Sequence, residues 1–172
     1  MKCITRDEAE EWLRPINAAI SADYSVVPRG EQYRHVTRPY LTDNVNPWLR
    51  CESITSWLPD GAQRLLWLSR WDTYPPGEIV LIETIRRASG EQRSLYETPG
   101  HVFEPTHYAN YDDRSPTEVV EASLMTSLLM LSASFGWDAA VFSKQCDDYI
   151  SVSDGTIFFW STSGGRLSAI PG

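Results

Sequence analysis

Residues 115–136 read SPTEVVEASLMTSLLMLSASFG and decide the fold more than any other stretch of the chain. Ser115, Pro116 and Glu118 predict a helix start, because a Ser and a Glu three residues apart can cap each other's backbone and Pro suits the first helical position. Gly136 predicts the helix end, since glycine readily adopts the left-handed conformation found there. Apolar side chains between these ends cover nearly the whole circumference, which is typical of a buried helix. We therefore expect a fold built around a central buried helix at about 116–135.

The C-terminal part of the sequence predicts antiparallel strands. Asp154-Gly155 separates two alternating runs and is typical of a two-residue hairpin turn. That turn places Val152 opposite Ile157 and Tyr149 opposite Trp160. Residues 139–143 supply a neighbouring strand. Helices combined with a C-terminal antiparallel β-meander give an α+β fold, and a length of 172 residues predicts a single globular domain over residues 1–172.

Further helices and a strand precede these elements. Thr5 and Glu8 form a second capping pattern, and Pro15 should interrupt the helix that follows it. Helices are also predicted over 46–58 and 78–88. The short apolar run at 64–70 favours a strand buried on both faces.

The composition excludes several functional classes. A formal net charge of −8 argues against nucleic acid and against an anionic membrane as partners. The three cysteines have no disulfide or zinc spacing, so a reducing cytoplasm is the expected location. The chain start has no apolar signal region, and serines and threonines make the long helix too polar to span a bilayer. No glycine-rich phosphate loop is present, and we expect no cofactor.

Residues 97–114 lack any period and contain Pro and Gly, which predicts a long loop. Such loops are uncommon in compact domains and are often functional. His101, Glu104 and His107 follow one another at intervals of three and are donors that metals accept. Pro105 excludes a helix that would place all three on one face, so we expect hydrogen bonds that fix the loop rather than a metal site.

The same loop also carries the residues of an enzymatic alternative. His101 or His107 beside Asp112 or Asp113 has the composition of an acid–base pair, as a hydrolase-type enzyme would need. Their spacing does not show that they meet, and no nucleophile motif accompanies them. We therefore expect no catalytic residue.

The stronger signal is a concentration of acids with interleaved aromatic residues. Between 104 and 121 five acids stand against Arg114 alone, a net charge of −4. Acids that steer association and aromatic residues that anchor it are typical of a surface that binds a basic protein. The alternative is a solvated surface at a helix N-terminus, where acids are favourable anyway. The predicted partner-binding residues are Glu104, Tyr108, Tyr111, Asp112, Asp113, Glu118 and Glu121.

In size, charge and aromatic content the chain is similar to bacterial immunity proteins, which neutralise a toxin by binding it. The resemblance covers composition and size and no motif, so it implies a function but no site residue. It implies a small acidic cytoplasmic module that inhibits a basic toxin. A third alternative is a structural subunit that forms a homodimer through the aromatic face of the hairpin, Tyr149, Phe158 and Trp160.

Overall fold

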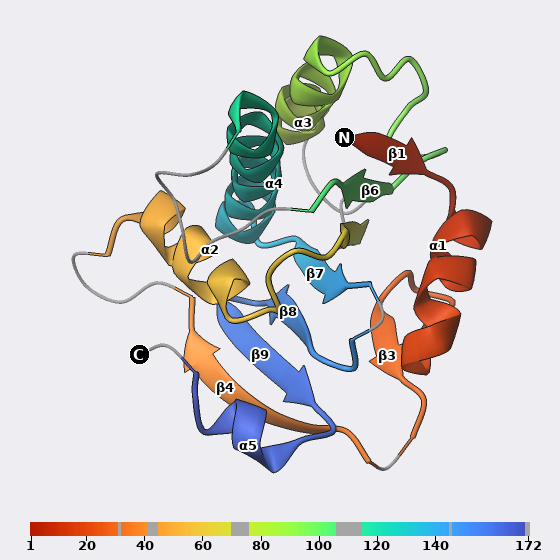
Figure 1. Ribbon diagram of the computed structural model, residues 1–172. Helices are drawn as coiled ribbons and strands as arrows, with labels where there is room; N and C mark the ends of the chain where they lie inside the picture. Colours follow the sequence, from red (N-terminus) through yellow and green to blue (C-terminus); the bar gives the residue numbers. More distant parts are fainter. Residues whose placement is uncertain (31, 41–44, 70–75, 106–114, 145, 171–172) are drawn as a thin grey trace.

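The computed structural model describes residues 1–30, 32–40, 45–69, 76–105, 115–144 and 146–170. Its main feature is a seven-stranded antiparallel sheet with the strand order β1-β6-β5-β7-β8-β9-β4 (Figure 1). The strands are β1 (Lys2–Ile4), β4 (Arg34–Pro39), β5 (Arg64–Ser69), β6 (Gly100–Phe103), β7 (Asp138–Ser143), β8 (Tyr149–Ser153) and β9 (Thr156–Ser161). Helices together with this sheet confirm the predicted α+β class.

One face of the sheet is covered by helices from the middle and the end of the chain. These are α2 (Pro47–Ser56), α3 (Pro76–Ala88), α4 (Pro116–Ser134) and the short α5 (Gly164–Leu167). The strands contribute Leu66, Val141, Ile150 and Phe159 to the core beneath them, and α4 contributes Leu128. This larger core lies between the sheet and the helices.

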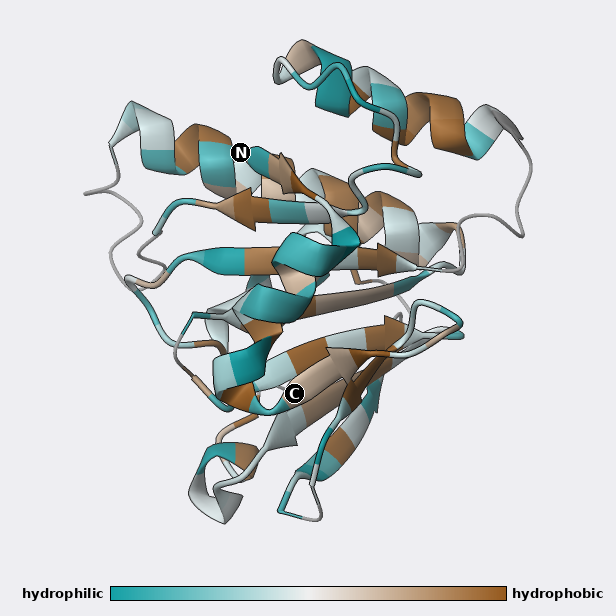
Figure 2. Cartoon of the chain, turned by 90° about the vertical axis from the view of Figure 1, so that its right-hand side faces the viewer, coloured by the Kyte–Doolittle hydropathy of each residue, from teal (hydrophilic) through white to brown (hydrophobic). Residues whose placement is uncertain are grey.

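The opposite face is covered by the N-terminal segment. It consists of α1 (Arg6–Leu13), a 3-10 turn η1 (Arg14–Ile16) and the separate hairpin of β2 (Ala18–Ile20) and β3 (Val26–Pro28). Leu13 and Ile16 pack there with Trp67, Phe142 and Tyr149 of the sheet. Figure 2 shows helical segments on both sides of the strands, which carry many of the apolar residues.

The sheet, with a core on each face, is therefore the central layer. All six residues of β5 are buried, which confirms a strand enclosed on both sides. The helix predicted from Ser115 forms over Pro116–Ser134 with its capping box. Burial around its whole circumference is not confirmed, because Val119 and Val120 are 36% and 56% exposed. The reason is that α4 packs on one face of a sheet and so needs only one buried side.

The other local predictions agree with the structure. The Thr5–Glu8 capping box starts α1, and the regular helix gives way to η1 at the residue before Pro15. At the C-terminal hairpin Asp154 and Gly155 have φ of 46° and 71°, and Val152 pairs with Ile157 as predicted. In the described ranges no helix is long and apolar enough to cross a membrane.

The prediction of an uninterrupted loop over 97–114 is wrong near its start. Residues 100–103 form β6, which pairs with β1 on one side and β5 on the other. The Pro99-Gly100 pair suggested a turn, but hydrogen bonding to two neighbours and burial override that local preference. Gly100 is required for packing, since a Cβ there would lie 2.7 Å from Ile4 Cγ1.

Candidate protein-binding surface

The predicted site residues divide into two groups. His107, Tyr108, Tyr111, Asp112 and Asp113 lie outside the described residues. The described ones are His101 and Glu104 at the end of β6, and Glu118 and Glu121 in the first turns of α4. The structure therefore describes the two ends of the segment between 104 and 121.

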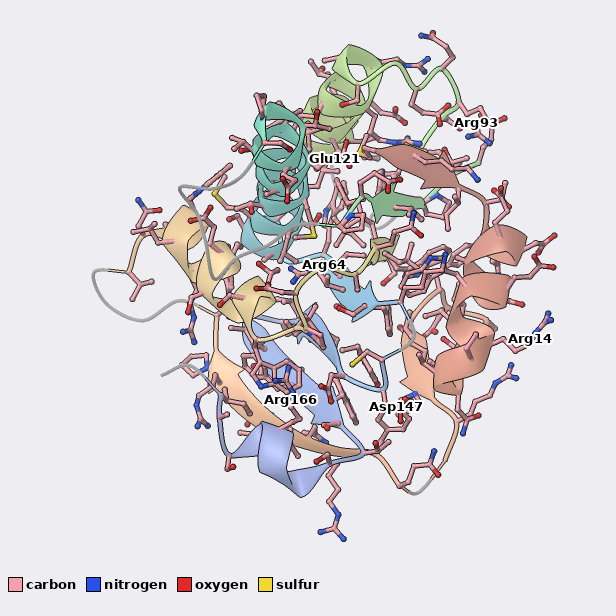
Figure 3. All side chains as sticks on the ribbon, in the orientation of Figure 1. Arg14, Arg64, Arg93, Glu121, Asp147 and Arg166 are labelled. Atoms are coloured by element: carbon pink, nitrogen blue, oxygen red, sulfur yellow. The ribbon has the colours of Figure 1, made fainter. Side chains whose placement is uncertain are left out.

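Glu121 connects the two ends inside the protein. Its carboxylate accepts a hydrogen bond from the backbone N–H of Glu104 at 3.2 Å and pairs with the amino group of Met1. The residue is only 7% exposed, and its side chain lies beside α4 where β1 and β6 approach the helix (Figure 3). The structure thus brings Glu104 and Glu121 together, but Glu121 acts in the fold and its carboxylate is not displayed to solvent.

Glu104, in contrast, is exposed and held by side chains from neighbouring strands. The side-chain amide of Gln63 donates to the Glu104 carboxylate at 3.3 Å. The ammonium of Lys144 donates to Oε1 of the same Gln63 at 2.9 Å. This chain of polar groups runs along the ends of β6, β5 and β7, so the Glu104 charge has a defined position at the sheet edge.

Glu118 is half-buried and forms part of the α4 cap. Its carboxylate accepts the N–H of Ser115 at 2.9 Å, while its own N–H donates to the Ser115 hydroxyl at 3.3 Å. The negative charge lies at the positive end of a helix dipole, where it is favourable. The next two residues, Val119 and Val120, are exposed. Acidic and apolar side chains are therefore adjacent at the start of α4.

The sequence did not predict that Val119 and Val120 are exposed, because the helix was expected to be buried on all sides. We define the acidic surface as Glu104, Glu118, Val119 and Val120. The only sequence signal for its apolar part is the Glu-Val-Val order directly after a helix cap, which places these residues in the first turns, before the helix reaches its most buried positions at Met125 and Leu128.

A groove of about 410 Å³ opens on the α1 side of the sheet, the face opposite to α4. Gln63 and Lys144, which position Glu104, line it together with Lys2, Glu8 and Trp12. Lys2 pairs with Glu8 at 3.6 Å, so the groove carries charges of both signs. The groove offers room for a partner side chain next to Gln63, the residue that positions Glu104.

His101 lies in a different environment from the one that acid–base catalysis needs. It is fully buried in β6, between Cys3 of β1 and Leu66 of β5. Burial, reinforced by the positive charge of Arg86, lowers the pKa of His101 to about 3, so the imidazole is neutral. Within the described ranges no group of three or more His, Cys, Asp or Glu side chains is arranged to hold a metal.

Three buried arginines change how the chain presents its charge. Arg50, Arg64 and Arg86 are 8%, 1% and 0% exposed. Arg86 binds Glu83 at 3.1 Å and the Thr98 carbonyl at 3.0 Å, so its charge holds α3 to the segment before β6.

Comparisons with protein-family models, with curated proteins and with solved structures give no match for this chain.

Proposed function

We propose that this chain is a protein-binding module that binds a basic protein through the acidic surface, as an immunity-type inhibitor of a basic toxin would. The observation that carries the proposal is the exposure of Val119 and Val120 beside Glu118, in the helix whose Glu121 binds the backbone N–H of Glu104. Apolar residues surrounded by charged ones are typical of a protein interface. The net charge of −8 supports a basic partner.

Binding is favoured over catalysis by the positions of the ionisable groups that the structure describes. His101 is enclosed in the core, and Glu121 is occupied by backbone and amino groups. The hydrolase-type alternative then depends on His107, Asp112 and Asp113, which lie outside the described residues.

The test begins with co-purification of a tagged chain from its native host, followed by binding kinetics with the purified partner. The variant Glu104→Gln with Glu118→Gln removes two charges, and Gln keeps the helix cap. We expect association to slow by roughly three- to tenfold at low salt, with a smaller difference at high salt, because exposed charges steer the encounter and are screened.

Val120→Ser tests the apolar part and should mainly speed dissociation, as loss of a contact residue does. The matched control is Asp154→Asn, which removes an exposed acid from the hairpin turn and keeps a residue that tolerates positive φ. An acidic partner, or unchanged rates for both surface variants with a basic partner, would refute the proposal.

A further inference from the structure

A second surface, which is positively charged, lies along the edge strand at the opposite end of the sheet from β1. β4 is the last strand in the sheet order, and no described strand pairs with its outer side. Its sequence, RHVTRP, contains Arg34, His35 and Arg38 within six residues of an acidic chain. Figure 1 shows β4 at the sheet edge, remote from β1 and β6. We call residues 34–39 the β4 edge.

The outer side of β4 has backbone groups that another strand could use. Tyr40 donates its N–H to the Gly155 carbonyl across the β4–β9 pair. Because hydrogen-bonding direction alternates along a strand, the N–H groups of Arg38 and Val36 point to β9, and those of Thr37 and His35 point outward. Pro39 lies at an outward position, where the missing N–H leaves the existing sheet intact.

The two faces of the β4 edge offer different side chains. Arg34 and Arg38 pair with Ser161 and Ile157, so both lie on the face that carries the larger core. They are separated by four residues, about 13 Å along a strand. Both can therefore reach carboxylates on one face of an added strand, at positions also four residues apart.

The opposite face carries an aromatic group. His35 pairs with Trp160 across the two strands, and their ring centroids are 4.5 Å apart. Phe158 adds a third ring, 6.2 Å from Trp160 and nearly parallel to it. His35 is exposed, and Phe158 and Trp160 are half-buried. These rings form an aromatic platform that begins at His35, the ring directly beside an added strand, and continues one strand further in at Phe158 and Trp160.

We propose that the β4 edge binds an extended acidic peptide, which adds an eighth strand to the sheet. Backbone hydrogen bonds from the outward N–H groups of His35 and Thr37 supply affinity that does not depend on sequence, while the outward Thr37 carbonyl already accepts from the Arg38 guanidinium at 2.9 Å. Pairs of carboxylates with Arg34 and Arg38, and apolar side chains on the aromatic platform, supply the preference for alternating acidic and apolar residues. This site is separate from the acidic surface and does not rest on the function proposed for it.

A second copy of the chain fits the β4 edge less well than an acidic peptide. Antiparallel overlap of two β4 strands centred on Val36 would bring Arg34 of each copy opposite Arg38 of the other. Like charges directly opposite each other destabilise a strand pair. The charge of the edge thus favours an acidic occupant.

The experiment uses a fluorescein-labelled peptide of four Glu-Val repeats and measures anisotropy with the whole protein at low salt. We expect saturable binding, and at least tenfold weaker binding to Arg34→Glu with Arg38→Glu. Thr37→Pro removes an outward N–H without touching the β9 pairing and should also weaken binding at least tenfold. The matched control, Arg14→Glu with Arg29→Glu, reverses two exposed charges elsewhere and should leave the Kd within about twofold, with the small change expected from net charge alone.

The order of residues in the peptide and the chemical class of the ligand give results that could overturn the proposal. A peptide with four Glu followed by four Val has the same charge but no alternation and should bind at least tenfold more weakly. The proposal is overturned if the two peptides bind equally, if neither binds, if a thymidine 12-mer binds more tightly, or if sedimentation shows a dimer that Thr37→Pro dissociates.

Melting curves of each variant identify those that fold. If Thr37→Pro unfolds, the Arg34 and Arg38 variants decide the result. Glu104→Gln with Glu118→Gln should bind the alternating peptide like the unaltered protein, so failure of one proposal leaves the other testable.

Discussion

At the scale of single residues, His101 should make the protein sensitive to mild acid. Its pKa is lowered from an ordinary value of 6.5 to about 3 by burial, so between these values the unfolded chain binds a proton that the folded chain does not. Stability is therefore complete above pH 6.5 and falls as the pH decreases toward 3, by up to about 1.4 kcal/mol per pH unit. Urea unfolding at pH 6.5 and pH 5 should differ by about 1–2 kcal/mol on this account.

His101→Leu removes the titrating group and should reduce that difference, whereas His35→Gln alters an exposed imidazole and should not. Carboxylates titrate mainly at lower pH, which is why the comparison is confined to pH 5 and above. An equal pH dependence in His101→Leu and the unaltered protein would show that this imidazole is not the sensitive group.

Tyr149 and Tyr33 provide a matched pair of buried hydroxyls. Tyr149 is stacked on Phe142 at 4.8 Å, and its hydroxyl has no hydrogen-bond partner among the described residues. Tyr33 donates its hydroxyl to the Ile16 carbonyl. Tyr149→Phe should therefore leave the free energy of unfolding unchanged or raise it, while Tyr33→Phe should lower it by about 1 kcal/mol. Denaturant titration measures both, and a larger loss for Tyr149→Phe would reveal a partner for that hydroxyl.

At the scale of elements, α4 should respond to mutation according to its two sides. Leu128 is fully buried against the sheet, whereas Val120 is 56% exposed. Leu128→Ala should cost about 2–5 kcal/mol through lost contacts and a cavity, and Val120→Ala should change stability by less than about 0.5 kcal/mol. Chemical denaturation distinguishes them. Similar losses of stability for both variants would support the sequence-based prediction that this helix is buried on all sides.

The helices and strands also show which sequence signals are sufficient to predict an element. The caps at Thr5 and Ser115 and the Asp154-Gly155 turn were predictable, because each depends on residues a few positions apart. β6 was not, because the four residues after Pro99 become a strand only when β1 and β5 pair with them. β1 begins about 100 residues before β6, and β5 begins 36 residues before it. The spacing of neighbouring residues therefore cannot predict this pairing.

At the scale of the whole molecule, the α+β class was predictable and the layer order was not. Apolar positions show that a helix is buried somewhere, but the sheet acquires its central place only when the N-terminal segment covers its second face. The same limitation applies to the candidate site. Acid clustering predicted Glu104 and Glu118, whereas the burial of Glu121 and the exposure of Val120 depend on how α4 meets the end of β6.

The central claim, that the acidic surface binds a basic protein, is tested most directly by amide hydrogen exchange of the chain with and without its purified partner. The account predicts slower exchange in the complex at Glu104 and at Val119 and Val120, with unchanged exchange at the β4 edge. Protection confined to the β4 edge, or to the hairpin around Asp154, would contradict the claim and assign the interface to another face.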